Sequence, residues 1–414
     1  MSPRWRTLCW LALAEWLALS LWFSASAVAP TLTTLWQLDE GGQAALTSAV
    51  QAGFVVGTLL SALTNLSDIF AARKLFVVCA WLGALCNAAV AWLADGLWMA
   101  LLFRFLTGMF LAGVYPPALK LARTWFAKDF GLALGIIVGA LTIGSASPQL
   151  LRVVGSPDWR ALILTASALA LSGGAIVLLR VREGPNTPAR AEFKWNYIFD
   201  GFRQRGVRLA MFGYFGHMWE LYAMWTWIPA FLLASLQSSD ASSDTRAVAG
   251  LSAFAIIASG GIGCIVAGAW ADRIGRPVVT IGSMVVSGLC CVLMGFAFGA
   301  PWWLMLLIGL VWGMTVVSDS AQFSASVGEL CEPRYIGTML TIQQSIGFLL
   351  TIVSIRMLPT IVNAVSWRYA FVTLAIGPLL GIIARQRFYG HFAVIVFLCQ
   401  FNFNRSHNKP SSCC

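Results

Sequence analysis

Long apolar runs separated by short polar connections make up most of this chain. Each run has about 20 residues, the length that an α-helix needs to cross the hydrocarbon core of a bilayer. Backbone polar groups in lipid must be satisfied within their own segment, so helices are expected and strands are not. The expected spans are residues 8–30, 44–66, 75–94, 97–122, 131–154, 161–179, 209–234, 247–271, 278–298, 302–327, 336–359 and 368–384. The pattern predicts an all-α integral membrane protein with about 12 transmembrane helices.

A charged, proline-containing segment at residues 181–208 divides the runs into two sets. We expect residues 1–180 to form an N-terminal six-helix bundle and residues 209–385 a C-terminal one, joined by this linker. Residues 386–414 are a polar tail whose apolar stretch is too short to span a membrane. An interfacial segment and the product of an altered reading frame are the two interpretations of the tail, and we assign it no function.

The cations follow the predicted topology. Lys and Arg gather in the linker and in every second connection, which by the positive-inside rule places the linker, the tail and both termini in the cytoplasm. The net charge of +10 therefore does not indicate nucleic-acid binding. With 59% hydrophobic and 11% charged residues, the chain is expected in a membrane, and its compact connections favour a bacterial inner membrane.

One connection carries a motif. The string at residues 268–276 reads Gly-Ala-Trp-Ala-Asp-Arg-Ile-Gly-Arg, and a degenerate copy with Asp68 and Arg73 follows an apolar run in the first half. This string resembles the loop motif of the major facilitator superfamily of secondary transporters. Its motif positions here are Gly268, Asp272, Arg273, Gly275 and Arg276. The two copies are 272 − 68 = 204 positions apart, and Trp159 and Trp367 repeat at 367 − 159 = 208, as two pseudo-symmetric halves require.

The resemblance extends to about residues 8–385 and implies the superfamily's fold and transport activity. The stretch from Arg104 to Pro116 is similar to the helix 4 pattern associated with proton transfer, and that from Gly135 to Pro148 is similar to the antiporter pattern, without its Gly-Pro pair. The branch that it resembles includes the bacterial nitrate- and cyanate-type transporters. Neither the second nor the eighth predicted helix has an interior Arg, so nitrate itself is not expected.

Ionisable residues inside membrane helices are costly and are candidates for function by default. In the superfamily the first, fourth, seventh and tenth helices line the cavity, and their interior ionisable residues here are Glu15, Arg104, His217, Glu220 and Asp319. Glu15 and Glu220 are 220 − 15 = 205 positions apart, which indicates symmetry mates. We interpret the acids and the histidine as a proton-coupling cluster and Arg104 as a counter-ion for an anionic substrate. The alternative is that all five stabilise helix packing.

We therefore predict a monomeric secondary transporter that takes up a small organic or inorganic anion with protons, by alternating access in the lipid bilayer. Efflux of drugs or metabolites is an alternative, and a non-transporting sensor or scaffold on the same fold is another. No catalytic constellation or metal-ligand spacing is visible, so we expect no enzyme activity, metal or cofactor.

Overall fold

The computed structural model describes residues 2–64, 66–126, 130–154, 158–186, 194–238, 245–332 and 335–389. The part of the tail from residue 390 onward and the side chain of Asp68 lie outside the described residues. The described chain is helical, with no strand. This confirms the all-α prediction.

The first six spans are α1 (Pro3–Leu19) with α2 (Ser24–Trp36), α3 (Glu40–Leu63), α5 (Ala72–Leu93), α6 (Leu97–Leu111) with α7 (Tyr115–Trp125), α8 (Phe130–Val154) and α9 (Trp159–Arg180). The last six are α11 (Arg205–Ser238), α12 (Thr245–Ile274), α13 (Arg276–Phe296), α14 (Trp302–Val316) with α15 (Ser320–Leu330), α16 (Ile336–Val365), and α17 (Trp367–Ala370) with η2 (Phe371–Ala375) and α18 (Ile376–Tyr389). Two short helices, α4 (Leu66–Ile69) and α10 (Asn196–Arg203), lie in the connections.

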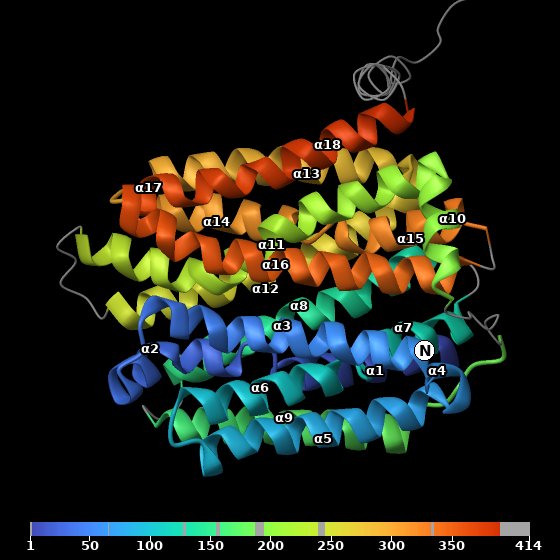
Figure 1. Ribbon diagram of the computed structural model, residues 1–414, viewed down its shortest axis with the longest axis horizontal. Helices are drawn as coiled ribbons and strands as arrows, with labels where there is room; N and C mark the ends of the chain where they lie inside the picture. The colour runs from blue at the N-terminus through green and yellow to red at the C-terminus, as the bar shows by residue number, and fades with distance from the viewer. Residues whose placement is uncertain are drawn as a thin grey trace, which may run out of the picture.

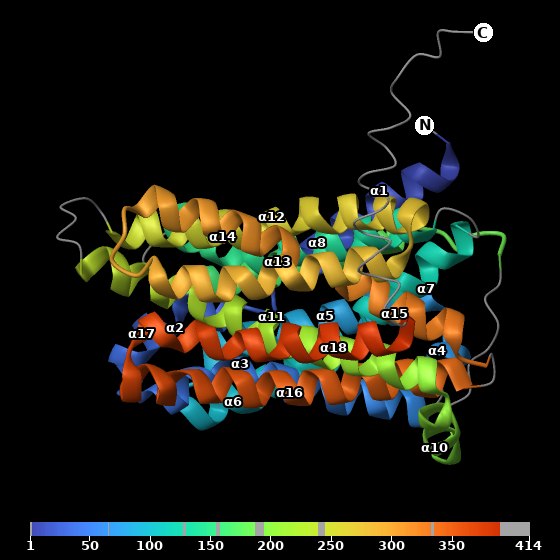
Figure 2. The ribbon, with the colours of Figure 1, turned by 90° about the horizontal axis from the view of Figure 1, so that it is seen from above.

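The two sets of six form two halves of one molecule. In Figure 1 the last six spans occupy the upper half and most of the first six occupy the lower half, with α8 against α12 between them. The short helix α10 and the start of α1 lie at the same end of the spans, seen from another side in Figure 2. We call this end the linker end.

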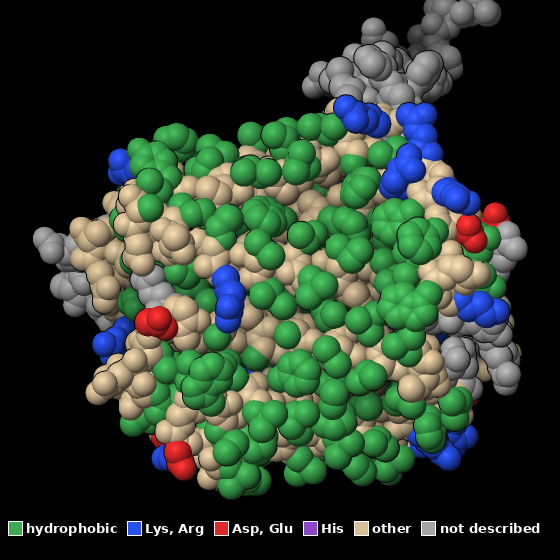
Figure 3. Space-filling view, in the orientation of Figure 1, with side chains coloured by type: hydrophobic (Ala, Val, Ile, Leu, Met, Phe, Trp, Pro, Cys, Tyr) green, Lys and Arg blue, Asp and Glu red, His purple; other side chains and the backbone are tan. Residues whose placement is uncertain are grey.

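The surface suits a bilayer. Among the described residues, eleven helical stretches are long and apolar enough to cross a membrane. The twelfth span, α11, has 34 residues and contains His217 and Glu220. On the face shown in Figure 3, hydrophobic side chains cover the middle while most Lys and Arg lie toward the ends. The chain is a multi-pass membrane protein.

Three spans that we predicted as continuous helices are broken, at residues 20–23, 112–114 and 317–319. At the second break, Pro116 and Pro117 begin α7, where their missing N–H groups cost nothing. At the first break, the released carbonyls of Leu21 and Trp22 accept hydrogen bonds from Arg104. The predictions of continuous helices were wrong here, and at the first break the reason is that the partner, Arg104, is distant in the sequence.

The bundles meet along two pairs of helices, α8 with α12 and α3 with α16. The first pair is antiparallel and approaches backbone to backbone. A Cβ atom on Gly135 would collide with the carbonyl of Cys264, and one on Gly139 would come within 2.9 Å of the carbonyl oxygen of Gly261. Small residues allow this approach, as they do at other helix contacts in membranes.

Candidate functional site

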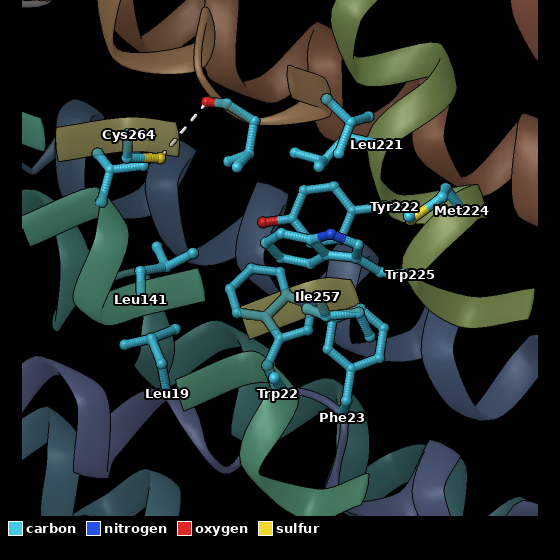
Figure 4. Packing of buried hydrophobic residues seen from close by; sticks show 14 of the residues in the cluster. Leu19, Trp22, Phe23, Leu141, Leu221, Tyr222, Met224, Trp225, Ile257 and Cys264 are labelled. Carbon is cyan, nitrogen blue, oxygen red and sulfur yellow. Dashed lines mark hydrogen bonds between the residues drawn. The ribbon is translucent and has the colours of Figure 1, made fainter. Parts of the chain in front are cut away.

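Six aromatic side chains from both bundles pack together at the centre of the interface. We call them the aromatic plug: Trp22, Phe23, Phe54, Tyr222, Trp225 and Phe348. All are buried. The ring centroids of Phe54 and Phe348, which come from opposite bundles, are 4.5 Å apart, and those of Trp22 and Tyr222 are 5.5 Å apart. Figure 4 shows Trp22 and Phe23 facing Tyr222 and Trp225. The plug closes the space between the bundles.

Several polar groups near this interface are buried without a hydrogen-bond partner in the described part of the chain. They include both carboxylate oxygens of Glu15, the side-chain amides of Gln51 and Gln343, the indole N–H groups of Trp22 and Trp225, and Nε2 of His217. A buried polar group with no partner costs about 1–3 kcal/mol. Both bundles thus carry buried polar groups whose hydrogen bonds are not made within the described part of the chain.

His217 on α11 and Asp319 form a buried pair. Nδ1 of His217 lies 2.8 Å from Oδ1 of Asp319, with side-chain exposures of 1% and 3%. The atoms are close enough for an ion pair when the imidazole is protonated, but they are not aligned as a hydrogen bond. Asp319 sits at the break between α14 and α15, at the N-cap position of α15.

The surroundings of this pair are largely aromatic. Tyr214 and Phe323 pack against the imidazole, with ring centroids 5.8 and 6.1 Å away. Cys264 on α12 donates to the carbonyl of Val317 in the same break, at 3.6 Å (Figure 4). The pair therefore lies in the packed interior of the C-terminal bundle, among aromatic rings and beside the break at residues 317–319.

Glu220 is bonded within its own bundle. Its carboxylate accepts hydrogen bonds from Trp312 Nε1 at 2.5 Å, Ser287 Oγ at 3.0 Å and Cys291 Sγ at 3.2 Å. These partners lie on α13 and α14. The structure thus places His217 beside Asp319. Glu15, on the opposite bundle, has no hydrogen-bond partner in the described part of the chain, and Glu220 links helices within its own bundle.

Arg104 on α6 is fully buried and has no carboxylate partner among the described residues. Nη1 donates to the carbonyl of Leu21 at 2.9 Å and to Asn87 Oδ1 at 2.9 Å, and Nη2 donates to the carbonyl of Trp22. The cation therefore holds the break between α1 and α2 and links it to Asn87 on α5. Only Nε lacks a partner.

The two halves carry these polar groups at corresponding positions. Cys291 follows Asn87 by 291 − 87 = 204 positions, and Trp312 follows Arg104 by 312 − 104 = 208. In the first half, Arg104 and Asn87 bond to a helix break, whereas in the second half Trp312 and Cys291 bond to Glu220. A buried cation in one bundle is matched by a buried carboxyl group in the other.

The loop motif lies at the linker end. The carboxylate of Asp272 lies against Gly131 at the start of α8, and Gly275 has a φ of 90°, which glycine adopts without strain. Arg276 is bonded to Glu329, with Nη2 at 2.8 Å from Oε1, and to Gln322.

In the first half, Arg73 donates to the carbonyls of Val177 and Leu178 at the end of α9. Gly268 packs against the carbonyl of Gly131, and Arg273 is exposed.

Some of these residues were missed by sequence reasoning. Asn87, Ser287 and Trp312 were not singled out, because an uncharged residue in an apolar run gives no signal of its own. The repeat offset was the one available signal, since it relates Trp312 to Arg104. Arg385 was assigned to topology, but it is fully buried and donates to Thr280 and Ser326.

No cluster of three metal-ligating side chains occurs in the described residues.

Comparison with known proteins agrees with this architecture. The family model described as Major Facilitator Superfamily matches residues 210–390, within the C-terminal half. No curated protein sequence matches the chain. Among solved structures, the chain is similar to a crystal structure of a mutant of the nucleoside transporter NupG, with a TM-score of 0.71 and 16% identity, over 93% of this chain and 100% of that chain.

These findings establish the fold and support the class. The chain has the major facilitator fold, and the match to its C-terminal half supports a membrane transporter of that superfamily. The resemblance to the nitrate- and cyanate-type branch stays a prediction.

Proposed function

We propose that this protein is a secondary active transporter that moves a small solute together with protons by alternating access. The observation that carries the proposal is the set of buried, unpaired polar groups that both bundles present near the aromatic plug. A solute bound there satisfies these groups. Rocking of the bundles about α8–α12 and α3–α16 then exposes the solute to either side of the membrane.

His217 and Asp319 are the proposed proton carriers, with Glu15 as the second acid. Tyr214 on the same helix and Phe323 on α15 pack against the imidazole, and Cys264 on α12 donates to the carbonyl of Val317 in the break beside Asp319. None of these is a fixed cation. A proton shared by the pair is therefore released when the break at residues 317–319 becomes hydrated, and is regained when the site closes.

Two substrate classes have support. Arg104 is a buried cation without a carboxylate partner, which favours a small anion, in line with the sequence prediction. The aromatic plug and the uncharged groups of Gln51, Gln343 and Trp225 favour an uncharged solute with a planar ring. A nucleoside has this chemistry, and the similar solved structure is titled a nucleoside transporter.

Uptake is the proposed direction of transport, and it requires the linker end to be cytoplasmic. Efflux is the alternative.

The test is transport by the purified protein in proteoliposomes. We expect an inward proton gradient to increase solute uptake, and a panel of nucleosides, carboxylates and inorganic anions identifies the solute. Asp319→Asn should abolish stimulation by the gradient but retain exchange of labelled for unlabelled solute, which needs no net proton movement. Asp200→Asn removes an exposed acid beside Arg203 and is the matched control.

The outcomes of these transport measurements distinguish the candidate functions. Full gradient stimulation in Asp319→Asn would contradict the proposed proton carriers. Stimulation by a gradient of the opposite sign would indicate efflux. Binding of a solute without transport in either direction would favour a sensor on the same fold.

A further inference from the structure

A groove of about 710 Å³ runs along the outside of the C-terminal bundle, near the linker end. It is lined by residues of α11 and α18 and by Leu350 of α16. The two main helices touch at both ends of the groove. A Cβ atom on Gly216 would collide with the carbonyl of Gly377, and Arg205 Nη2 donates to the carbonyl of Arg387 at 3.0 Å.

Three arginines, Arg205, Arg208 and Arg387, gather at one end of this groove, and its lining contains no acidic residue. Arg208 Nη1 donates to the carbonyl of Phe202 at 3.0 Å, and no carboxylate in the described part of the chain pairs with any of the three. Each guanidinium has five N–H donors, so most of these donors remain available. The end of the groove is a concentrated positive charge.

The remainder of the groove is apolar and faces outward. Phe212 is 46% exposed, Leu380 58% and Ile383 39%, although all three belong to membrane-spanning helices. Such side chains face lipid. From Arg205 to Trp219 the groove follows 15 residues of α11, and the 14 steps between them span about 21 Å at ~1.5 Å of rise per residue. That length compares with about 15 Å for half of the hydrocarbon core of a bilayer.

We propose that this groove binds an anionic phospholipid from the leaflet at the linker end. The phosphate of the headgroup binds the three arginines through charge-assisted hydrogen bonds, and an acyl chain packs along Phe212, Leu380 and Ile383. A guanidinium suits a phosphate better than an ammonium does, because its paired N–H groups match two phosphate oxygens. The site is independent of the proposed transport path, since it lies on the outer face of α11.

The test compares lipid binding by two double variants of the full chain. Arg208→Gln with Arg387→Gln removes two cations from the groove. Arg180→Gln with Arg203→Gln is the control, because it removes two exposed cations elsewhere in the chain. Native mass spectrometry and thermal unfolding are measured in detergent with added phosphatidylglycerol, with phosphatidylcholine, or with glycerol phosphate alone.

We expect phosphatidylglycerol to be retained and to raise the unfolding temperature, and its apparent affinity to fall at least five-fold in the groove variant but not in the control. Leu380→Arg, which places a charge in the acyl path, should weaken lipid binding with all three arginines intact. Equal loss in both double variants would overturn the proposal, because it would indicate a general charge effect. Equal retention of phosphatidylcholine, or stabilisation by glycerol phosphate alone, would overturn it as well.

Discussion

The carboxylate of Asp272, at the end of α12, lies against Gly131 in the first turn of α8. The two residues belong to different bundles, so the contact joins the halves at the linker end. A carboxylate at a helix N-terminus is stabilised by about 0.3–1 kcal/mol, because it faces the unpaired N–H groups and the positive end of the helix dipole. A Cβ atom at residue 131 would occupy the place of the carboxylate oxygens.

Gly131→Ala should therefore displace Asp272 and loosen the linker end. We expect faster amide hydrogen exchange in the first turn of α8, and the same change in Asp272→Asn. The double variant should show little further effect, since both substitutions remove one interaction. Gly282→Ala on α13 is the control, because a Cβ atom there meets nothing within 4 Å. Additive effects of the two substitutions would show that they act separately.

Replacement of Arg104 should destabilise the N-terminal bundle. Arg104→Leu leaves the carbonyl of Trp22 buried without its donor, at a cost of about 1–3 kcal/mol, whereas the carbonyl of Leu21 keeps the Ser24 hydroxyl as a donor. Arg104→Lys should recover only part of this loss, because one ammonium does not replace a fork of donors. Thermal unfolding in detergent measures the effect. Arg160→Lys on the partly exposed end of α9 is the control and should unfold at the wild-type temperature.

Substitution of Glu220 distinguishes a structural role of its carboxyl group from a role in proton coupling. Trp312→Phe removes one hydrogen bond to a carboxyl group, worth about 1.5–3 kcal/mol if that group is charged. We expect Glu220→Gln and Trp312→Phe to lower the unfolding temperature by similar amounts while the folded protein keeps gradient-driven uptake. The proton-coupling role predicted from the sequence requires the opposite result for Glu220→Gln, namely normal stability with no gradient-driven uptake.

The ion pair between Arg276 and Glu329 should contribute little to stability. The Glu329 side chain is 60% exposed, and exposed pairs are typically worth up to about 1 kcal/mol. Glu329→Gln should change the unfolding temperature slightly, and less at high salt, where the pair is screened. Arg276→Gln should cost more, because Arg276 is mostly buried and is also bonded to Gln322. An equally large, salt-independent loss in both variants would contradict this ranking.

Much of the fold was predictable from the sequence, because lipid imposes one requirement on every span. An apolar run of sufficient length must be helical, so the twelve spans follow from the pattern of apolar and polar positions. The helix breaks did not follow from it. The break at residues 20–23 is satisfied by Arg104, 80 or more positions away, and no local pattern reports such a partner.

The candidate site was predictable only as a set of residue types. The cost of charge in a membrane directed attention to His217 and Asp319, which the structure places side by side, while their role stays a prediction. The same rule does not distinguish Glu15, whose oxygens are unpaired, from Glu220, which has three hydrogen-bond donors. Their positions in the repeat are equivalent, but their neighbours have diverged, and only the packed structure shows those neighbours.

In the alternating-access cycle proposed above, the backbone contact between α8 and α12 influences which residues rearrange. Where Gly135 and Gly139 meet Cys264 and Gly261, the interface has few interlocking side chains. A rotation of one helix relative to the other at this contact therefore needs few changes of side-chain rotamer. The interlocked rings of the aromatic plug have no such freedom, so the activation barrier to opening should arise mainly at Trp22, Phe54 and Phe348.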